Sequence, residues 1–153
     1  MSARDDIVSL MNQYCFTIDT GDFEGFARLF ADGEWTVEGG VVARGKAQLL
    51  AGMANVRIYA DGTPRTRHVT SNIDLTVDEA GGTAESQCYV TVFQQAPGFA
   101  LQVIFSGHYF DDFARVDGRW RFKRRLIRHT LVGDMSAHVK APMKLLGTAA
   151  NKA

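Results

Sequence analysis

Four long segments in the second half of the chain alternate apolar with polar residues, and they constrain the fold more than any other feature. The segments cover residues 67–78, 82–95, 99–116 and 119–133. Short turns such as "EAGG" and "DG" separate them. A repeat of two residues is typical of β-strands, and strands joined by short turns pair in antiparallel fashion. The sequence therefore predicts one long antiparallel sheet.

The first 30 residues have the spacing of helices instead. An apolar stripe predicts a helix from about Ala3 to Asp19 and places Tyr14 on its buried face. The stripe consists of Ile7, Leu10, Met11, Tyr14 and Ile18. After the break "TGD", where Thr20 or Asp22 is the capping residue, a second helix is predicted. Its inner face would contain Phe23, Phe26, Leu29 and Phe30.

Short elements connect these helices to the strands. "EWTVEGGVVARG" predicts a hairpin that turns at Gly39–Gly40, residues 45–59 predict a third, less regular helix, and residues 60–66 a loop. Helices followed by a long sheet indicate an α+β domain. We expect N-terminal helices packed in the concavity of a strongly curved antiparallel sheet, a cone-shaped α+β barrel with a pocket inside. A single domain would cover 1–135, and 136–153 would be a partly ordered tail.

The composition limits the partners of the chain. Seventeen basic residues balance 17 acidic ones, so no nucleic-acid partner is expected. No stretch reaches the ~18 apolar residues of a membrane span, so we expect no membrane partner and a cytoplasmic location. A small apolar molecule and a second copy of the chain remain as partners. The apolar residues Val90, Val92, Val103 and Phe105 are candidates for an exposed face that a homodimer or homotrimer would cover.

The sequence lacks the usual signatures of cofactor and metal sites. Cys15 and Cys88 lie far apart in apolar surroundings and are interpreted as buried free thiols. No histidine pair has the spacing of metal ligands, and no phosphate-binding or dinucleotide-binding motif occurs. We therefore expect no metal and no cofactor.

Two polar residues stand at the end of the first helix, where apolar packing is expected. Tyr14 alone is more often a packed core residue than an acid, and Asp19 needs a partner to have a role. His68 opens the first long strand, in a polar row with Thr70 and Asn72. Such a row usually faces solvent, but a polar pocket or a strand bulge would turn it inward.

The three other histidines differ in their surroundings. His108 lies beside apolar residues and reads as a packed side chain, with a catalytic role as the alternative. His129 shares a strand with Arg125 and Arg128 and could border the pocket or face water. His138 falls in the predicted tail and is given no role.

Three segments carry a resemblance to a known family. "YCFTIDTGDFEGFARLFADGEWTVEG", "RHVTSN" and "GHYFDDFARVDGRWRFKRRLIRH" resemble, in this order, the SnoaL-like group of the nuclear transport factor two-like superfamily. The group includes scytalone dehydratase, bile acid 7α-dehydratase and hexachlorocyclohexane dehydrochlorinase. The resemblance covers nearly the whole chain and implies the cone-shaped fold.

The resemblance also implies a catalytic set. In dehydratase and dehydrochlorinase members, a strand histidine is the base and an aspartate at the helix end orients it; His68 and Asp19 match these positions. Tyr14, five residues before Asp19, matches a tyrosine of bile acid dehydratase-like members. The implied activity is that of a cofactor-independent lyase or isomerase acting on an apolar cyclic, aromatic, terpenoid or steroid-like substrate. Expected substrate-binding residues are Asn72, Arg125, His129, His108, Trp35 and Phe23.

Other activities occur on the same fold, and fold alone does not decide among them. A non-catalytic ligand-binding protein or oxygenase-type subunit is the main alternative. The test that separates it is whether Asp19 and His68 hydrogen-bond inside an enclosed cavity. Epoxide hydrolysis would need an Asp–Arg–Asp set, such as Asp19 and Arg125 with Asp111 or Asp74, and ranks last.

Overall fold

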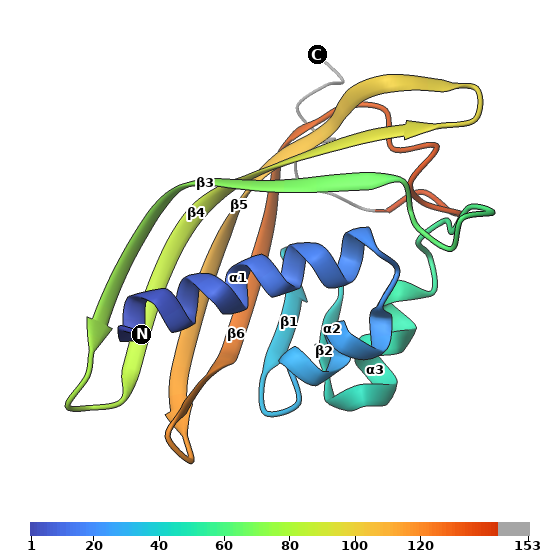
Figure 1. Ribbon diagram of the computed structural model, residues 1–153. Coiled ribbons are helices and arrows are strands. Elements are labelled where there is room, and N and C mark those ends of the chain that lie inside the picture. The colour runs from blue at the N-terminus through green and yellow to red at the C-terminus, as the bar shows by residue number, and fades with distance from the viewer. Residues whose placement is uncertain (144–153) are drawn as a thin grey trace.

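The computed structural model describes residues 1–143 of the chain, and the regular elements of that part are shown in Figure 1. The helices are α1 (Ala3–Asp19), α2 (Phe23–Leu29) and α3 (Gly45–Met53). The strands are β1 (Glu34–Val37), β2 (Val42–Arg44), β3 (Thr66–Asp78), β4 (Thr83–Ala96), β5 (Phe99–Val116) and β6 (Arg119–Val132). No helix among these is long and apolar enough to cross a membrane.

The six strands form one sheet in the order β2-β1-β6-β5-β4-β3. The sheet bends around α1, which lies across its concave side (Figure 1). This arrangement confirms the α+β prediction. One detail of the prediction is wrong: β1 pairs in parallel with β6, with Trp35 opposite Arg125, so the sheet is mostly but not wholly antiparallel. Residues far apart in sequence make this pair, and local turn signals do not reveal such pairing.

Helix α1 begins and ends at the predicted residues because its signals are local. Ser2 and Asp5 form a capping box, in which the Ser2 side chain accepts from the Asp5 backbone and the Asp5 side chain from the Ser2 backbone. Thr20 is the C-cap, and Asp22 caps α2 by accepting a hydrogen bond from the Gly25 backbone at 2.8 Å. Both expected capping residues therefore act at this break.

A bulge in β3 decides which of its side chains face the helices. Asn72 has a left-handed backbone (φ 55°), and the pairing with β4 shifts register between Ser71 and Asp74. Before the bulge the row with His68 faces inward and Val69 is 48% exposed. After it, Ile73 and the alternate residues beyond pack against the core. The polar row therefore faces the cavity only where His68 lies.

The outer face of the sheet differs from the expectation. Val90, Val92 and Phe105 were candidates for exposure but are buried on the inner side, whereas Val103 is 44% exposed. The reason is the alternation of side chains along β4 and β5, in which every second residue faces the helices. Register shifts after Val92 and after Ser106 exchange the residues that face the helices with those that face outward. Tyr89, 51% exposed, occupies the outer side of β4 instead.

The chain after β6 packs onto the domain as a segment that we call the C-terminal strap (residues 134–143). Helix α3 ends before the predicted residue 59 because Val56 forms a β-bridge with Val139 of the strap. The Tyr59 hydroxyl donates to the Ala137 carbonyl at 2.6 Å, and Gln94 donates to the same carbonyl at 3.0 Å. The predicted tail 136–153 is thus held in place over 136–143, and its remainder, 144–153, lies outside the described residues.

Candidate active site

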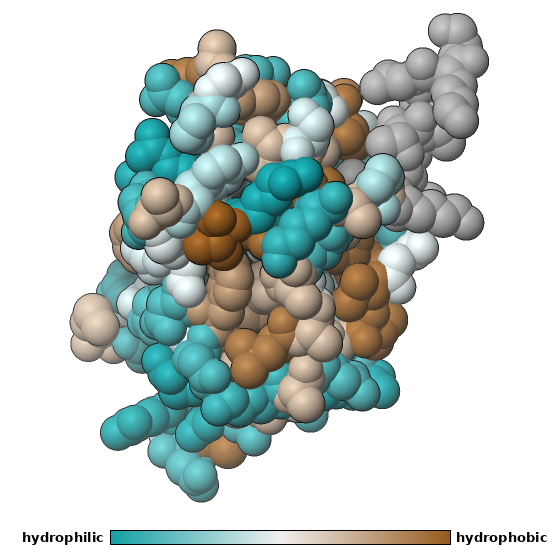
Figure 2. All heavy atoms as spheres, turned by 90° about the vertical axis from the view of Figure 1, so that its right-hand side faces the viewer, coloured by the Kyte–Doolittle hydropathy of each residue, from teal (hydrophilic) through white to brown (hydrophobic). Residues whose placement is uncertain are grey.

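A cavity of about 220 Å³ lies between the helices, the sheet and the C-terminal strap. Residues of α1, β1, α3, β3, β5, β6 and the strap line it, and most of them are apolar. On the face of the molecule shown in Figure 2, apolar side chains gather between hydrophilic borders. The polar side chains that reach the cavity wall are those of Tyr14, Asn55, His68, Tyr109, His129 and His138. Trp35 also lines the cavity, as expected.

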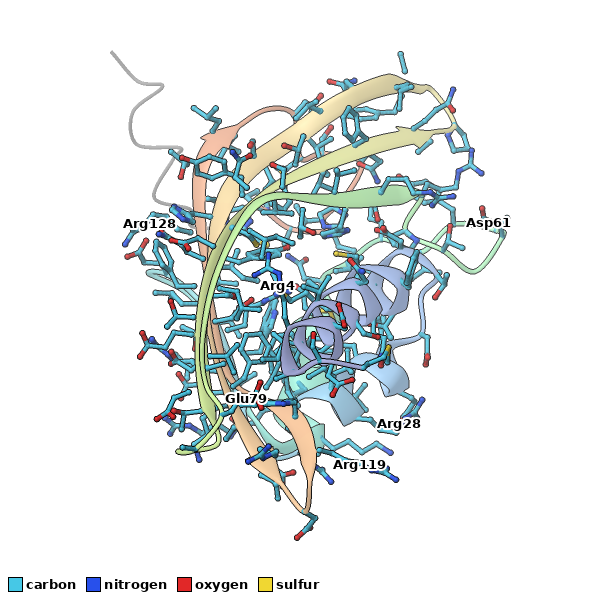
Figure 3. All side chains as sticks on the ribbon, turned by 60° about the vertical axis from the view of Figure 1, so that its left-hand side comes forward. Arg4, Arg28, Asp61, Glu79, Arg119 and Arg128 are labelled. Carbon is cyan, nitrogen blue, oxygen red and sulfur yellow. The ribbon has the colours of Figure 1, made fainter. Side chains whose placement is uncertain are left out.

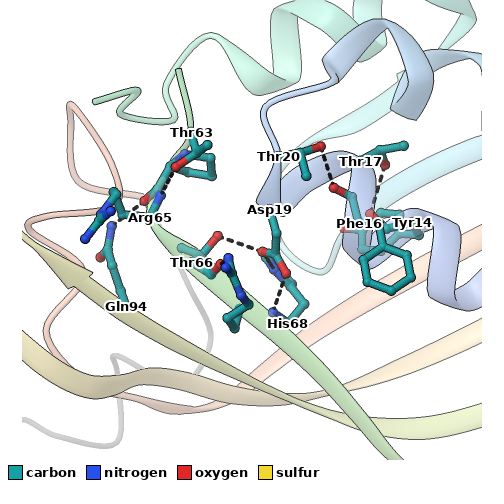
Figure 4. Close-up of polar contacts among 12 residues, drawn as sticks. Tyr14, Phe16, Thr17, Asp19, Thr20, Thr63, Arg65, Thr66, His68 and Gln94 are labelled. Atoms are coloured by element: carbon teal, nitrogen blue, oxygen red, sulfur yellow. Dashed lines mark hydrogen bonds and ion pairs between the residues drawn. The ribbon is translucent and has the colours of Figure 1, made fainter. Parts of the chain in front are cut away.

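Asp19 and His68 form the dyad that the sequence suggested (Figure 4). The Asp19 Oδ1 lies 2.6 Å from His68 Nδ1 and accepts a hydrogen bond from the Thr66 hydroxyl at 2.8 Å. The His68 backbone N–H donates to Oδ2 at 2.8 Å. The side chains of His68 and Asp19 are only 5% and 7% exposed, so water does not compete for these contacts.

The dyad fixes the tautomer of His68. An ionised carboxylate only accepts hydrogen bonds, so Nδ1 carries the hydrogen and Nε2 carries the lone pair. His68 lines the cavity, whereas Asp19 does not and lies behind it. The arrangement can therefore accept a proton from a molecule in the cavity at Nε2, with Asp19 stabilising the charged ring.

A glycine brings the two halves of the dyad together. Gly21, just after α1, has φ +76°, and a Cβ at this position would collide with the carbonyl oxygen of Gly62. The close approach places the end of α1 against the loop that leads into β3. Asp19 is the last residue of α1 and Thr66 the first of β3, so this approach sets their separation.

Tyr14 borders the same cavity from α1. The Trp35 indole N–H donates to its hydroxyl oxygen at 3.2 Å. Burial raises the pKa of the Tyr14 hydroxyl, although the Arg125 cation acts in the opposite direction. Tyr14 is therefore protonated at neutral pH, and its hydroxyl has the Tyr109 side chain as a second hydrogen-bonding neighbour.

Arg125 does not reach the cavity, contrary to expectation. Its guanidinium makes two hydrogen bonds to Asp111, at 2.8 and 2.6 Å, and both side chains are fully buried. It also lies 4.2 Å from the centre of the Tyr14 ring and 4.1 Å from that of Tyr109. Burial opposes the charge on Arg125, but Asp111 raises its pKa, so the ion is retained. These rings separate Arg125 from the cavity.

Two further histidines line the cavity, and one of them was missed. His129 lies on β6 as expected, whereas His138 comes from the C-terminal strap. Burial, with a contribution from nearby His68, lowers the pKa of each ring to about 4, so both are neutral at pH 7. The sequence contained one signal for this segment, an apolar residue at every fourth position on both sides of His138: Met135, Val139 and Met143. This pattern could have predicted that the segment packs against the domain.

Three other expected binding residues lie away from the cavity. Asn72 is exposed at the bulge of β3. His108 faces the outer side of the sheet, where its ring stacks on Phe110 at 4.2 Å, because Tyr109 takes the inward position. Phe23 packs against the core beside α2. The expectation that these residues line the pocket is therefore wrong.

The outer side of the sheet is polar around His108. Figure 3 shows Arg128, its neighbour in the β5–β6 pairing, projecting on the side of the sheet opposite α1. Arg128 makes two hydrogen bonds to Glu38, at 2.5 and 2.9 Å. Within residues 1–143, no three histidine, cysteine, aspartate or glutamate side chains gather closely enough to hold a metal ion.

Buried thiols near the site are inert. Cys15 and Cys88 are free and buried, as expected. Burial raises the pKa of Cys15 to about 11 and that of Cys88 to about 12. Neither thiol is ionised at neutral pH, so neither is a nucleophile there.

Solved structures with the same fold are numerous. A protein of unknown function from Mycobacterium tuberculosis is 31% identical, covering 81% of this chain and 69% of its own, with a TM-score of 0.66. A scytalone dehydratase-like protein from Novosphingobium aromaticivorans is 28% identical over 94% of this chain and 93% of its own, with a TM-score of 0.67. No curated protein matches the chain.

More distant structures extend the likeness of fold. Hexachlorocyclohexane dehydrochlorinase LinA-type3 from Novosphingobium barchaimii is 21% identical over 94% of both chains, with a TM-score of 0.69, which shows the shared fold alone. At the level of sequence, the model of the SnoaL-like domain matches residues 1–126. That match spans both residues of the dyad and most of the sheet, and the chain belongs to the SnoaL-like domain family.

Proposed function

We propose that the protein is a cofactor-independent lyase or isomerase that removes a proton from a small uncharged cyclic substrate. The observation that carries the proposal is the 2.6 Å contact between Asp19 and His68 at the wall of an apolar cavity. A base held by a buried carboxylate in this way is a general-base arrangement. A chain that only bound ligands would not need it.

The reaction would begin at His68. Nε2 takes a proton from a carbon next to an activating group such as a carbonyl, and the electron pair of the C–H bond moves toward that group. The ring becomes an imidazolium whose Nδ1–H is held by the Asp19 carboxylate. A positioned base of this kind contributes roughly 10²–10⁴-fold to the rate.

Tyr14 is the candidate acid. Because its oxygen accepts the Trp35 hydrogen bond, its own O–H hydrogen can point to a ligand atom. It would donate to the carbonyl oxygen on which charge develops, or to a departing hydroxyl. The name of the 28% identical scytalone dehydratase-like relative supports loss of water as the reaction.

The size of the cavity narrows the substrate class. Its 220 Å³ lies below the ~300–1,000 Å³ of most ligand pockets, so one- or two-ring compounds fit better than steroids. Among residues 1–143, the buried cation near it is Arg125, and this residue is already paired with Asp111. An uncharged substrate is therefore favoured over an anionic one.

Proton exchange provides a test that does not require the natural substrate. A panel of one- and two-ring ketones and β-hydroxyketones is incubated with the protein in D₂O, and NMR follows deuterium entry at carbon and loss of water. We expect catalysed exchange or elimination with at least one compound and a 10²–10⁴-fold loss in the His68→Gln variant. His108→Gln, a histidine on the other face of the same sheet, is the matched control and should retain full activity.

Two outcomes would contradict the proposal. One is equal exchange by wild type and His68→Gln. The other is tight ligand binding without exchange of any bound compound, which would favour the ligand-binding alternative.

Self-association is a separate proposal. Tyr89, Val103 and Leu131 are exposed apolar residues of the sheet, at 51%, 44% and 67%, and a homodimer or homotrimer would cover them. Light scattering of the wild type and of Tyr89→Glu measures this directly. A monomeric wild type would end the proposal.

A further inference from the structure

His129 and His138 are buried polar side chains at the wall of the cavity. Each residue is only 8% exposed. Among residues 1–143, the Nδ1 atom of either ring has no hydrogen-bond partner. A buried polar atom without a partner costs free energy, which a fold retains only for a reason. Both rings line the cavity, so a ligand there meets imidazoles whose hydrogen-bonding capacity residues 1–143 leave partly unused.

We propose that His129 and His138 form a polar subsite that binds an uncharged oxygen of the substrate, a carbonyl or a hydroxyl. The oxygen would lie at this subsite while an adjoining carbon faces His68. This placement of the carbon rests on the proposed function. Binding of the oxygen does not.

The rings are positioned close to the dyad. The centre of the Phe105 ring is 4.4 Å from that of His129 and 6.4 Å from that of His68. His129 and His68 therefore border neighbouring parts of one cavity, each near the same phenylalanine. A ligand of one or two rings can reach both.

The C-terminal strap holds His138 in place through its backbone. The His138 N–H donates to the Met135 carbonyl at 2.9 Å, and its carbonyl accepts from the Arg57 N–H at 2.8 Å. The Arg57 side chain also donates to the Ser136 and Val139 carbonyls, at 3.1 and 3.0 Å. The position of the ring is thus set before a ligand arrives.

The chemistry of the two rings selects an uncharged ligand. Burial lowers the pKa of both to about 4, so each is a neutral imidazole with one donor and one acceptor nitrogen. Neutral imidazoles can hydrogen-bond a carbonyl or a hydroxyl but offer no positive charge. A carboxylate would bring a buried charge with no counter-ion at the subsite.

Binding of matched probes tests the subsite without any turnover. Acetophenone and α-methylstyrene have the same shape and differ only in C=O against C=CH₂, and benzoate adds a charge. NMR titration should show that the wild type binds acetophenone about three- to tenfold more tightly than α-methylstyrene. Benzoate should bind more weakly than acetophenone.

Variants locate the preference. The double variant His129→Leu/His138→Met keeps Tyr14 as a donor, so it should show a smaller preference for acetophenone than the wild type, and its binding of α-methylstyrene reports that the cavity is intact. His129→Gln/His138→Gln, which keeps hydrogen-bonding groups, should restore part of the preference. His108→Gln, at a histidine on the outer side of the sheet, should keep the preference of the wild type.

The proposal is overturned if the wild type shows no preference, if the Leu/Met variant keeps it in full, or if His108→Gln loses it. Failure of the proposed function looks different. In that case the wild type would prefer acetophenone through His129 and His138 and yet catalyse no proton exchange.

Discussion

Two buried acid–base pairs lie inside this domain, and they differ in what surrounds them. Asp19 and His68 meet at 2.6 Å with one side of the imidazole facing a cavity. Asp111 and Arg125 also meet at 2.6 Å, but the rings of Tyr14, Tyr109 and Phe122 cover the guanidinium. The first pair has a base that a ligand can reach. The second has a cation that keeps its proton and is sealed from ligands.

Tyr14 lies between the two pairs. Its ring centre is 6.3 Å from that of His68 and 4.2 Å from the Arg125 guanidinium carbon. The difference teaches that burial and ion pairing alone do not indicate catalysis, because the sealed pair has both. Access from the cavity distinguishes the pair that we assign to chemistry.

The largest effect of a single substitution is expected on stability, at the sealed pair. Asp111→Asn leaves the buried Arg125 charge without its counter-ion and should lower the free energy of unfolding by about 3–5 kcal/mol. Urea denaturation followed by circular dichroism measures this. The double variant Asp111→Leu/Arg125→Met should recover most of the loss. If Asp111→Asn were as stable as the wild type, the Asp111–Arg125 pair would not be the structural pair that we contrast with Asp19–His68.

The next effect concerns activity, at the open pair. Asp19→Asn removes the charge that stabilises the His68 imidazolium, and should reduce proton exchange about 10²- to 10³-fold, or about 3–4 kcal/mol in the barrier. Denaturation should show a smaller loss of stability than for Asp111→Asn, because a neutral imidazole is left rather than an unpaired cation. The reverse order of stabilities would contradict the comparison.

Acid should lower the stability of the protein through the two buried histidines of the cavity wall. His129 and His138 have folded-state pKa values of about 4 against ~6.5 when unfolded. The unfolded chain therefore binds more protons between these values, and stability that is complete above pH 6.5 is lost as pH falls toward 4. The loss is about 3 kcal/mol for each histidine. His129→Gln/His138→Gln should flatten this part of the pH profile of unfolding; an unchanged slope would show that other groups cause it.

The smallest effect is expected where the two pairs meet. Tyr14→Phe removes the hydroxyl that accepts from Trp35 and keeps the ring against Arg125. Exchange activity should fall about tenfold, the value of one hydrogen bond to a charged group. Stability should change by about 1 kcal/mol or less. Tyr89→Phe, at a tyrosine on the outer side of the sheet, is the control and should exchange at nearly the wild-type rate.

The sequence predicted the parts of the fold that depend on neighbouring residues. The bounds of α1 follow from its apolar stripe and from the capping residues Ser2 and Asp5. The parallel pairing of β1 with β6 joins residues about 90 positions apart, and no local signal specifies it. The C-terminal strap was missed for the same reason, since its contacts are to α3, β4 and the loop after α3.

The candidate site was predicted in part. Asp19, His68 and Tyr14 were identified through the resemblance to a family; the structure places His68 and Tyr14 at one cavity, with Asp19 behind His68. Alternation alone would have placed His68 in solvent, because it assumes an unbroken strand. Asn72 and His108 were misplaced by the same assumption, since single-residue bulges change the phase of a strand without changing its composition.

The bulge at Asn72 divides the labour along a single strand. On its N-terminal side β3 carries His68, which we assign to chemistry, and on its C-terminal side it carries residues that pack against the core, Ile73, Leu75 and Val77. Random substitutions along β3 should therefore sort at residue 72 into one class that alters turnover and another that alters melting temperature. During evolution, substitutions before residue 72 could therefore change the substrate, while residues after it remained under selection for folding.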